Sequence, residues 1–298
     1  MHKTKFYTAL IISLFIITAC SGSHGNSSAG MQIKGSDTIV NLVQVWAEKF
    51  NNINNTTNIG VTGGGTGTGF AALLNATCDI AMASRQVEEI ETNLAKQKGI
   101  TYKEYIVGLD GLAVLVNKDN PIDKLTIEQL RDIFMAKITN WKELGGEDRK
   151  IVILSRESNS GTHMFFKDNV IRLNNPDSKD EFSPKALLMP SSQAIVDEIY
   201  QNPNAIGYVG IGFMNEQTKP VAISDIGKEE FFLPTIENVM HGKYPISRPL
   251  YLYTNGEPKG VVKEFIDYTL STEGQKVVAE TDFVPRTTVE KLERQLKS

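Results

Sequence analysis

Hydroxyl side chains, glycines and two arginines gather in four short segments of the sequence. The hydroxyl groups belong to Ser36, Thr38, Thr66, Thr68, Ser84, Ser155, Ser158, Ser160 and Thr162. Arg85 and Arg156 lie among them, and a guanidinium group binds oxyanions through paired hydrogen bonds. Gly161 and the glycines of 63–69 let the backbone approach a ligand closely. This set of donors favours the reversible binding of an oxyanion.

The glycine-rich run at 63–69 does not match a nucleotide-binding motif. It lacks the Gly-Lys-Ser/Thr ending of a P-loop. Its glycines are spaced wrongly for a dinucleotide fingerprint, and no acidic residue follows about twenty positions later on a clear strand end.

A secreted phosphate-ester hydrolase is an alternative from a different class. Such an enzyme needs a metal cluster or an activated nucleophile. Of the four histidines, His2 and His24 lie in the N-terminal segment, so that His163 and His241 remain. Carboxylates could still build a site, but the sequence shows no spaced His/Asp cluster. We therefore expect no metal, no cofactor and no catalysis, and we place His163 on a helix surface.

Each of the four segments follows residues typical of a β-strand. The expected strands are 31–34, 58–62, 79–83 and 151–154, and the expected helices are 39–50, one from 70 and one from 162. This alternation predicts an α/β fold with a mixed or mostly parallel sheet. Ligands bind at the carboxyl ends of such strands, where the helix that follows offers free amide groups. We therefore expect the four segments to converge.

Two apolar stretches, 108–116 and 248–253, are suited to cross between domains. They divide the chain into a discontinuous lobe I, residues 32–111 plus 253–298, and a lobe II, residues 112–252. A chain of 298 residues usually forms about two domains. The sequence thus predicts a two-lobed α/β protein with a central cleft and two hinge strands.

Residues 1–19 have the layout of a signal peptide. Lys3 and Lys5 precede an apolar run that is too short for an ordinary transmembrane helix. The small residue before Cys20 resembles a lipobox, in which this cysteine carries lipid; the alternative is a plain signal peptide with an incidental cysteine. Residues 20–31 would then be a flexible tether. We expect an exported protein that is anchored to the outer face of the cell membrane or is periplasmic.

Composition argues against other classes of protein. The chain has 31 basic and 35 acidic residues and a net charge of −4, which argues against nucleic-acid binding because that needs a basic surface. Its hydrophobic content of 41% is too high for a disordered chain. Two cysteines are too few for a disulfide framework, and we expect Cys78 to be buried.

Several strings resemble the phosphate-binding proteins of phosphate ABC transporters, the PstS family. They are GSDTIVNL (35–42), TGGGTGTG (62–69), DIAMASR (79–85), LDGLAVLVN (109–117), KLTIEQLRDIFMAKITNWKELGG (124–146) and SRESNSGTH (155–163). The resemblance implies a type II periplasmic binding protein fold that closes over one inorganic phosphate. It also implies delivery to membrane permease subunits driven by a cytoplasmic ATPase. The sequence carries no clear oligomer signal, and we expect a monomer.

Carried over residue by residue, the resemblance assigns the phosphate-binding groups. They are Ser36, Asp37, Thr38, Thr66, Ser84, Arg85, Arg156, Ser160, Gly161 and Thr162. Hydroxyl and amide groups would bind the phosphate oxygens, and Arg156 would supply charge. Trp141, in the string Ile-Thr-Asn-Trp, is expected to be a packing anchor.

One departure from the family pattern concerns selectivity. Better-known members carry an aspartate near the position of Ser84, where it accepts the proton of phosphate and rejects sulfate. Here the nearest carboxylate in a ligand segment is Asp37, and we assign the proton-acceptor role to it. An N-cap role for Asp37 on the helix at 39–50 is equally open. A binding protein for sulfate or molybdate also remains an alternative, because it would share the fold.

Overall fold

The computed structural model describes residues 30–54 and 58–286. The predicted signal peptide and Cys20 lie outside these residues, together with most of the expected tether. Met31, which the expected tether (20–31) and the expected strand (31–34) share, opens the first strand and is 3% exposed. In the described part of the chain, no helix is long and apolar enough to span a membrane.

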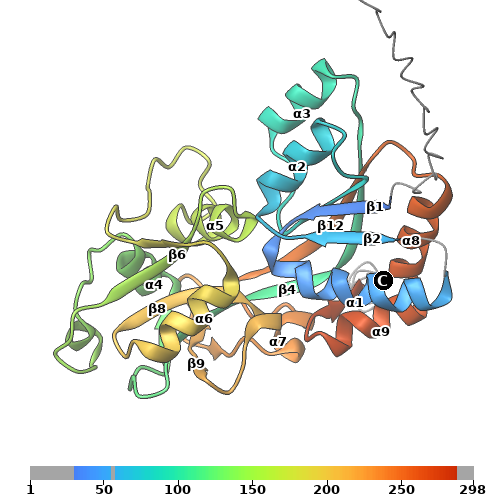
Figure 1. Cartoon of the computed structure of the whole chain (residues 1–298). Helices are drawn as coiled ribbons and strands as arrows, with labels where there is room; N and C mark the ends of the chain where they lie inside the picture. The colour runs from blue at the N-terminus through green and yellow to red at the C-terminus, as the bar shows by residue number, and fades with distance from the viewer. Residues whose placement is uncertain (1–29, 55–57, 287–298) are drawn as a thin grey trace, which may run out of the picture.

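Strands and helices alternate along most of the chain (Figure 1). The strands are β1 (Met31–Gly35), β2 (Ile59–Thr62), β3 (Ile80–Ala83), β4 (Tyr102–Asn117), β5 (Lys124–Thr126), β6 (Val152–Arg156), β7 (Leu187–Met189), β8 (Ala205–Gly210), β9 (Thr218–Pro220), β10 (Ala222–Ser224), β11 (Phe231–Phe232), β12 (Ser247–Asn255) and β13 (Val284–Pro285). The α-helices are α1 (Val40–Ile53), α2 (Thr66–Leu74), α3 (Glu89–Gln97), α4 (Ile127–Phe134), α5 (Gly161–Phe166), α6 (Ser192–Gln201), α7 (Ile236–Met240), α8 (Gly260–Leu270) and α9 (Thr272–Glu280). The other helical turns are η1 (Asp37–Ile39), η2 (Trp141–Leu144), η3 (Lys167–Ile171) and η4 (Ile211–Phe213). The predicted α/β class is confirmed.

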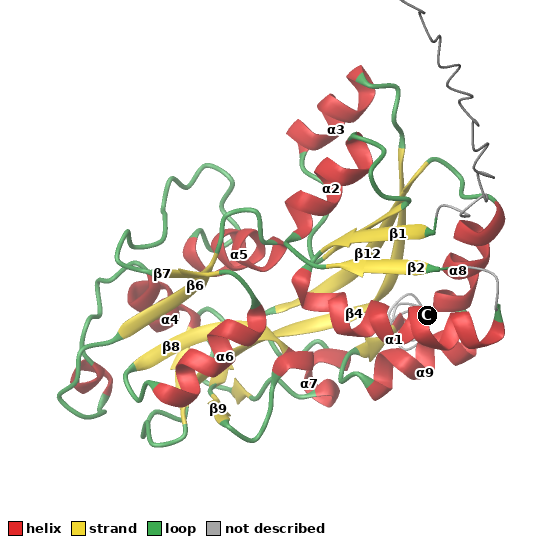
Figure 2. Ribbon diagram, viewed as in Figure 1, coloured by secondary structure: helices red, strands yellow, loops and turns green. Residues whose placement is uncertain are grey.

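One mixed sheet runs through the whole molecule. Its strand order is β2-β1-β3-β12-β4-β8-β6-β7, with β9 and β13 also paired to β4, and a small second sheet has the order β11-β10-β5. Figure 2 shows two lobes built on this sheet: β1, β2 and β3 carry α1, α2 and α3 on one side of the molecule, and β6 and β8 carry α4, α5 and α6 on the other. The lobe with β1 is called lobe I below, and the lobe with β6 is called lobe II.

The hinge strands β4 and β12 join the two lobes. The first part of β4 pairs antiparallel with β12, and its last residues pair with β8 of lobe II. Residues 112–116 of β4 are all fully buried, which explains their unbroken apolar run, because a strand covered on both faces needs no polar alternation. Within this pairing, Arg248 of β12 stands directly opposite Asp110 of β4.

Helix α1 covers lobe I with one apolar face. Its buried residues are Leu42, Val43, Trp46, Ala47 and Phe50, which recur at the spacing of a helix that packs on a core. The indole nitrogen of Trp46 donates to the carbonyl oxygen of Gly274 at 2.7 Å and so ties α1 to α9.

Helix α2 begins at Thr66, although the sequence indicates a loop that continues to Gly69. The glycine at 69 is what allows the helix to lie this close to β1. A β-carbon there would be 2.8 Å from the α-carbon of Gly35 and 2.8 Å from the carbonyl oxygen of Lys34. This close packing places Thr66 beside the carboxyl end of β1.

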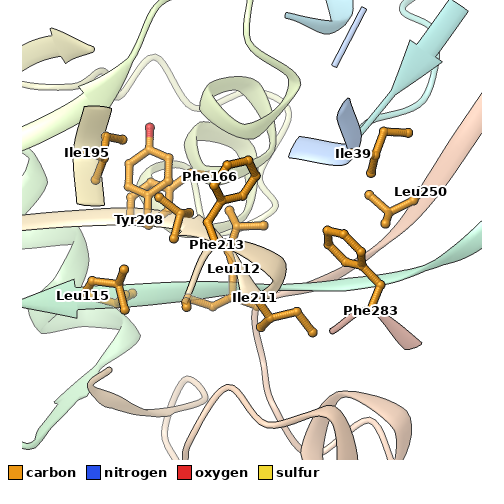
Figure 3. Close-up of a cluster of buried hydrophobic side chains, with 14 of the residues drawn as sticks. Ile39, Leu112, Leu115, Phe166, Ile195, Tyr208, Ile211, Phe213, Leu250 and Phe283 are labelled. Atoms are coloured by element: carbon orange, nitrogen blue, oxygen red, sulfur yellow. The ribbon is translucent and has the colours of Figure 1, made fainter. Parts of the chain in front are cut away.

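The apolar core continues from one lobe into the other. Figure 3 shows Leu112 and Tyr208 on the side of lobe II, with Leu250 and Phe283 toward lobe I. Trp141 is the packing anchor that the sequence indicates, because it is 1% exposed and its indole donates to a backbone carbonyl. Cys78 is buried as well, and burial raises the pKa of its thiol to about 11.

Candidate functional site

Residues from the four hydroxyl-rich segments that follow β1, β2, β3 and β6 meet at the contact between the lobes. The hydroxyl oxygens of Thr38 in lobe I and Thr162 in lobe II are 2.7 Å apart. Ser36 donates to the hydroxyl of Ser84 at 2.9 Å, and Thr66 Oγ1 lies 3.4 Å from Ser84 Oγ. We define the hydroxyl cluster as Ser36, Thr38, Thr66, Ser84, Ser160 and Thr162, each of which is at most 2% exposed.

The closest approach between the lobes lies at Gly161, the first residue of α5. A β-carbon at this position would be 2.3 Å from Thr66 Oγ1 and 2.6 Å from Ser84 Oγ. Beside it, the amide of Gly67 in α2 donates to the carbonyl oxygen of Asn159 at 3.0 Å. Figure 1 shows α2 and α5 facing each other at this contact. A side chain at residue 161 would therefore prevent the lobes from closing this far.

Ser160 caps helix α5. Its Oγ accepts hydrogen bonds from the amides of Thr162 and His163, at 3.2 and 3.4 Å. The amide of Thr162, predicted as a ligand donor, is thus engaged within its own helix turn. The hydroxyl hydrogens of Ser160 and Thr162 can still be donated to an anion, because a serine or threonine hydroxyl accepts and donates at the same time.

Arg156 is a buried cation at the end of β6. Its Nε and Nη2 donate to the carbonyl oxygens of Met189 and Pro190, and its Nη1 donates to Ser192 Oγ at 3.1 Å. Nη1 also lies 3.3 Å from Asp37 Oδ2. Burial lowers the pKa of Arg156, but an ordinary pKa above 12 leaves the guanidinium charged at neutral pH.

Asp37 connects lobe I to lobe II. Its Oδ2 accepts from the backbone amide of Ser192 at 2.7 Å as well as from Arg156. The alternative N-cap role is wrong, since neither η1 nor α1 has a side-chain capping hydrogen bond at its start. The carboxylate faces lobe II instead, where it accepts from a backbone amide and from a charged guanidinium.

Arg85 is not brought to the hydroxyl cluster. Its Nη1 and Nη2 each donate to the carboxylate of Glu91 at 2.8 Å, and its guanidinium lies 5.3 Å from the ring centre of Phe70. Ser84 and Arg85 form a bend that follows β3. The backbone that directs Ser84 into the cluster directs Arg85 away from it, toward the start of α3.

Arg248 and Asp110 also belong to the site, although the motifs in the sequence do not indicate them. The Nη2 of Arg248 donates to both Thr38 Oγ1 and Thr162 Oγ1, at 3.2 and 2.9 Å, and its Nε donates to Asp110 Oδ2 at 3.0 Å. Both side chains are at most 2% exposed. Each of the two apolar hinge stretches contains a single charged residue. A charge inside a protein is tolerated only when it is paired, so these two residues could have been predicted to form an ion pair.

His163 is buried, so the expected place on a helix surface is wrong. It is 8% exposed, its ring stacks on Phe182 at 4.5 Å, and its Nδ1 lies 3.2 Å from Ser155 Oγ. Burial and then the positive charge of Lys167 lower the pKa of His163 to about 4. The imidazole is therefore neutral at physiological pH and serves the packing behind the cluster.

This buried histidine predicts a loss of stability in mild acid. Its ordinary pKa of 6.5 falls to about 4 in the folded chain, so between these values the unfolded chain binds more protons. The free energy of unfolding should fall by as much as about 3 kcal/mol as the pH drops through this window. Urea unfolding from pH 7 to pH 4 measures it. His163→Gln should flatten the curve, whereas His241→Gln removes the same ring from an exposed position as the control. A His163→Gln curve that follows the parent would contradict the assignment.

The site offers hydroxyl donors and positive charge. Within residues 30–54 and 58–286, no group of three or more His, Cys, Asp or Glu side chains could hold a metal ion. Six buried hydroxyl groups lie at the contact between the lobes, where the guanidinium of Arg248 donates to two of them and that of Arg156 pairs with Asp37. That arrangement can surround a small tetrahedral oxyanion with charge-assisted hydrogen bonds.

Comparison with known proteins places the chain among substrate-binding proteins. Residues 22–273 match the PBP superfamily domain. The phosphate-binding protein PstS of Pseudomonas aeruginosa is 33% identical over 282 residues, which cover 89% of this chain and 84% of the relative. The PstS of Bacillus subtilis is 32% identical, with 96% of both chains covered.

Solved structures agree with the sequence relatives. A substrate-binding protein from Clostridium perfringens, solved with bound phosphate, is 33% identical with a TM-score of 0.76, covering 86% of this chain and 99% of that one. An ABC-type phosphate transport receptor from Vibrio cholerae is 31% identical with a TM-score of 0.67, covering 85% and 99%. The chain described here therefore belongs to the PBP superfamily and, within it, to the PstS family of substrate-binding proteins.

Proposed function

We propose that this protein captures inorganic phosphate between its lobes. The observation that carries the proposal is the hydroxyl cluster, which draws buried donors from both lobes and places them beside Arg156 and Arg248. In the described structure all of these hydroxyls except that of Ser160 contact another hydroxyl of the cluster. Phosphate would replace those neutral contacts with charge-assisted hydrogen bonds, which are roughly twice as strong. The bound phosphate of the relative from Clostridium perfringens supports this ligand.

The remaining predicted groups fit the same role in part. Asp37, Gly161 and the hydroxyl cluster lie together at the contact between the lobes, and we assign them to the phosphate site. Arg85 is the exception, because its guanidinium pairs with Glu91 and Glu88 at the start of α3. Its contribution is the orientation of the loop between β3 and α3.

The captured phosphate would be passed on without chemical change. We propose an extracytoplasmic protein that hands its ligand to the permease subunits of an ABC transporter, driven by a cytoplasmic ATPase. A lipid on Cys20 would hold it at the membrane, and it would act as a monomer. Lobe I would comprise residues 32–111 plus 253–298 and lobe II residues 112–252. The relatives named as phosphate-binding proteins support this role.

Calorimetric titration of the mature chain with phosphate, sulfate and molybdate tests the proposal. Phosphate should bind in one-to-one stoichiometry and at least a hundredfold more tightly than the other two anions. Tighter binding of sulfate or molybdate would assign the protein to that anion instead. Turnover of a chromogenic phosphate ester by the same preparation would support the hydrolase alternative.

The proton-acceptor role of Asp37 predicts a change of selectivity. A carboxylate facing the ligand accepts the proton of hydrogen phosphate but leaves sulfate without a donor, so Asp37→Asn should reduce the phosphate-to-sulfate affinity ratio by about tenfold or more. Titration of both anions measures the ratio. Asp79→Asn is the matched control, because the carboxylate of Asp79 also accepts a backbone amide, that of Gln32, but lies away from the cluster. An unchanged ratio in Asp37→Asn would remove this role from Asp37.

A further inference from the structure

Arg248 lies in the hinge and contacts both lobes at once. It belongs to β12, yet its Nη2 donates to Thr38 Oγ1 of lobe I at 3.2 Å and to Thr162 Oγ1 of lobe II at 2.9 Å. Both hydroxyls belong to the cluster that surrounds the proposed phosphate site. The side chain is 2% exposed. A guanidinium group this deeply buried needs a partner for each of its donors, because solvent does not supply one.

Asp110 fixes one edge of this guanidinium group. Its Oδ2 accepts from Nε at 3.0 Å and from Nη2 at 2.9 Å, and its Oδ1 accepts from the backbone amide of Ile211 at 3.0 Å. Asp110 is fully buried and stands opposite Arg248 in the β4–β12 pairing. The carboxylate is therefore immobile, and it holds the Nε–Nη2 edge of the guanidinium in one orientation.

The other edge of the guanidinium reaches the hydroxyl cluster through Nη2 and is incompletely satisfied at Nη1. Nη1 is buried and has no hydrogen-bond partner among residues 30–54 and 58–286. Nη2 has only neutral hydroxyl partners on this side. The Nη1–Nη2 edge is a planar fork of two donors, the geometry that matches two oxygens of a tetrahedral oxyanion.

We propose that Arg248 is a further phosphate-binding residue, whose Nη1–Nη2 edge donates to the anion, and that Asp110 is the residue that positions it. This assignment rests on the proposed function. Arg156 already donates to two backbone carbonyls, to Ser192 and to Asp37, whereas Arg248 has a donor left over. Arg248 thus adds a donor and positive charge to those that Arg156 brings to the site.

A purely structural role for the pair makes a different prediction. An ion pair that only holds the hinge strands together would affect stability and leave affinity unchanged. Removal of Arg248 alone would also leave Asp110 as an unpaired buried charge, which strongly destabilises a protein. The test therefore neutralises both partners together and adds a variant that keeps the charge.

The paired variant Asp110→Asn/Arg248→Gln is compared with the parent by calorimetric titration with inorganic phosphate. We expect about a thirtyfold or greater loss of affinity. Asp225→Asn/Lys228→Gln, which neutralises an exposed ion pair in the same way, is the control and should bind like the parent. Arg248→Lys keeps a cation beside Asp110 but lacks the fork, and we expect about a tenfold loss. Thermal unfolding without phosphate confirms that each variant is folded.

The role of Asp110 has its own spectroscopic readout. The side-chain ¹⁵N signals of Arg248, assigned by their loss in Arg248→Lys, should shift on addition of phosphate to the parent. In Asp110→Asn this shift should shrink, because the fork is no longer held toward the anion.

The outcomes separate the two proposals. A parent chain that fails to bind phosphate overturns the proposed function and this assignment with it. A parent that binds phosphate while the folded paired variant binds it equally well overturns the role of Arg248 alone. If the paired variant does not fold, parent-like affinity in Arg248→Lys is the overturning result. An Arg248 signal unmoved by phosphate would also overturn it.

Discussion

Arg156→Met should lower the affinity for inorganic phosphate by about a thousandfold. Arg156 is 2% exposed and is held in place by Met189, Pro190 and Ser192, so its charge is preorganised beside the cluster. Removing one member of a buried, hydrogen-bonded charge pair costs about 2–5 kcal/mol, and about 4 kcal/mol corresponds to a thousandfold change in affinity. Asp37 would also lose its cation and would then repel the anion. Calorimetric titration measures the loss.

Arg131→Met provides the control for this substitution. Arg131 also lies in lobe II and also donates to a backbone carbonyl, that of Ile171, and to a carboxylate, that of Asp180. It is remote from the hydroxyl cluster, so phosphate affinity should stay within about twofold of the parent. An Arg156→Met protein that is folded and binds phosphate as tightly as the parent would contradict the proposed site.

Gly161→Ala should lower phosphate affinity by about a hundredfold without weakening the unliganded fold. The new methyl group would lie 2.3 Å from Thr66 Oγ1 and 2.6 Å from Ser84 Oγ, so either the lobes stay apart or both hydroxyls turn away. Either response removes two hydrogen bonds to the anion, each worth about 1.5–3 kcal/mol when the acceptor is charged. Alanine is a better helix former than glycine in the first turn of α5, so the melting temperature without ligand should hold or rise.

Titration and small-angle scattering, with and without phosphate, measure this effect. The scattering should show that the variant fails to reach the compact, closed form of the liganded parent. Gly67→Ala is the matched control on the opposite lobe, because its β-carbon would meet Asn159 O at an ordinary distance of 3.4 Å. Parent-like affinity and closure in Gly161→Ala would mean that the lobes do not need to meet this closely.

Local patterns predicted the parts of the site that depend on strand ends. Ser36, Ser84 and Thr162 each follow a strand, and the parallel pairing of β1 with β3 brings the first two together. The meeting of Thr38 with Thr162 follows from the two-lobed division. These features could be predicted because the strand before a turn and the helix after it fix the position of that turn in the fold.

Features that depend on side-chain direction or on distant partners could not be predicted. Arg85 follows Ser84 directly but points to the other side of the chain, where Glu91 binds it. Arg248 and Asp110 are far apart in the sequence, and only the register of β12 on β4 makes them neighbours. His163 is buried because Phe182, from a remote loop, covers its ring.

The position of β12 in the sheet also fixes an order of assembly. β12 lies between β3 and β4, although it comes after every strand of lobe II in the chain. A polypeptide emerging from its N-terminus can complete lobe II while the sheet of lobe I still lacks its middle strand. The segment from β1 to β3 must therefore wait, with one sheet edge exposed, until β12 arrives, and this interval is when the newly made chain is most open to aggregation and most in need of a chaperone.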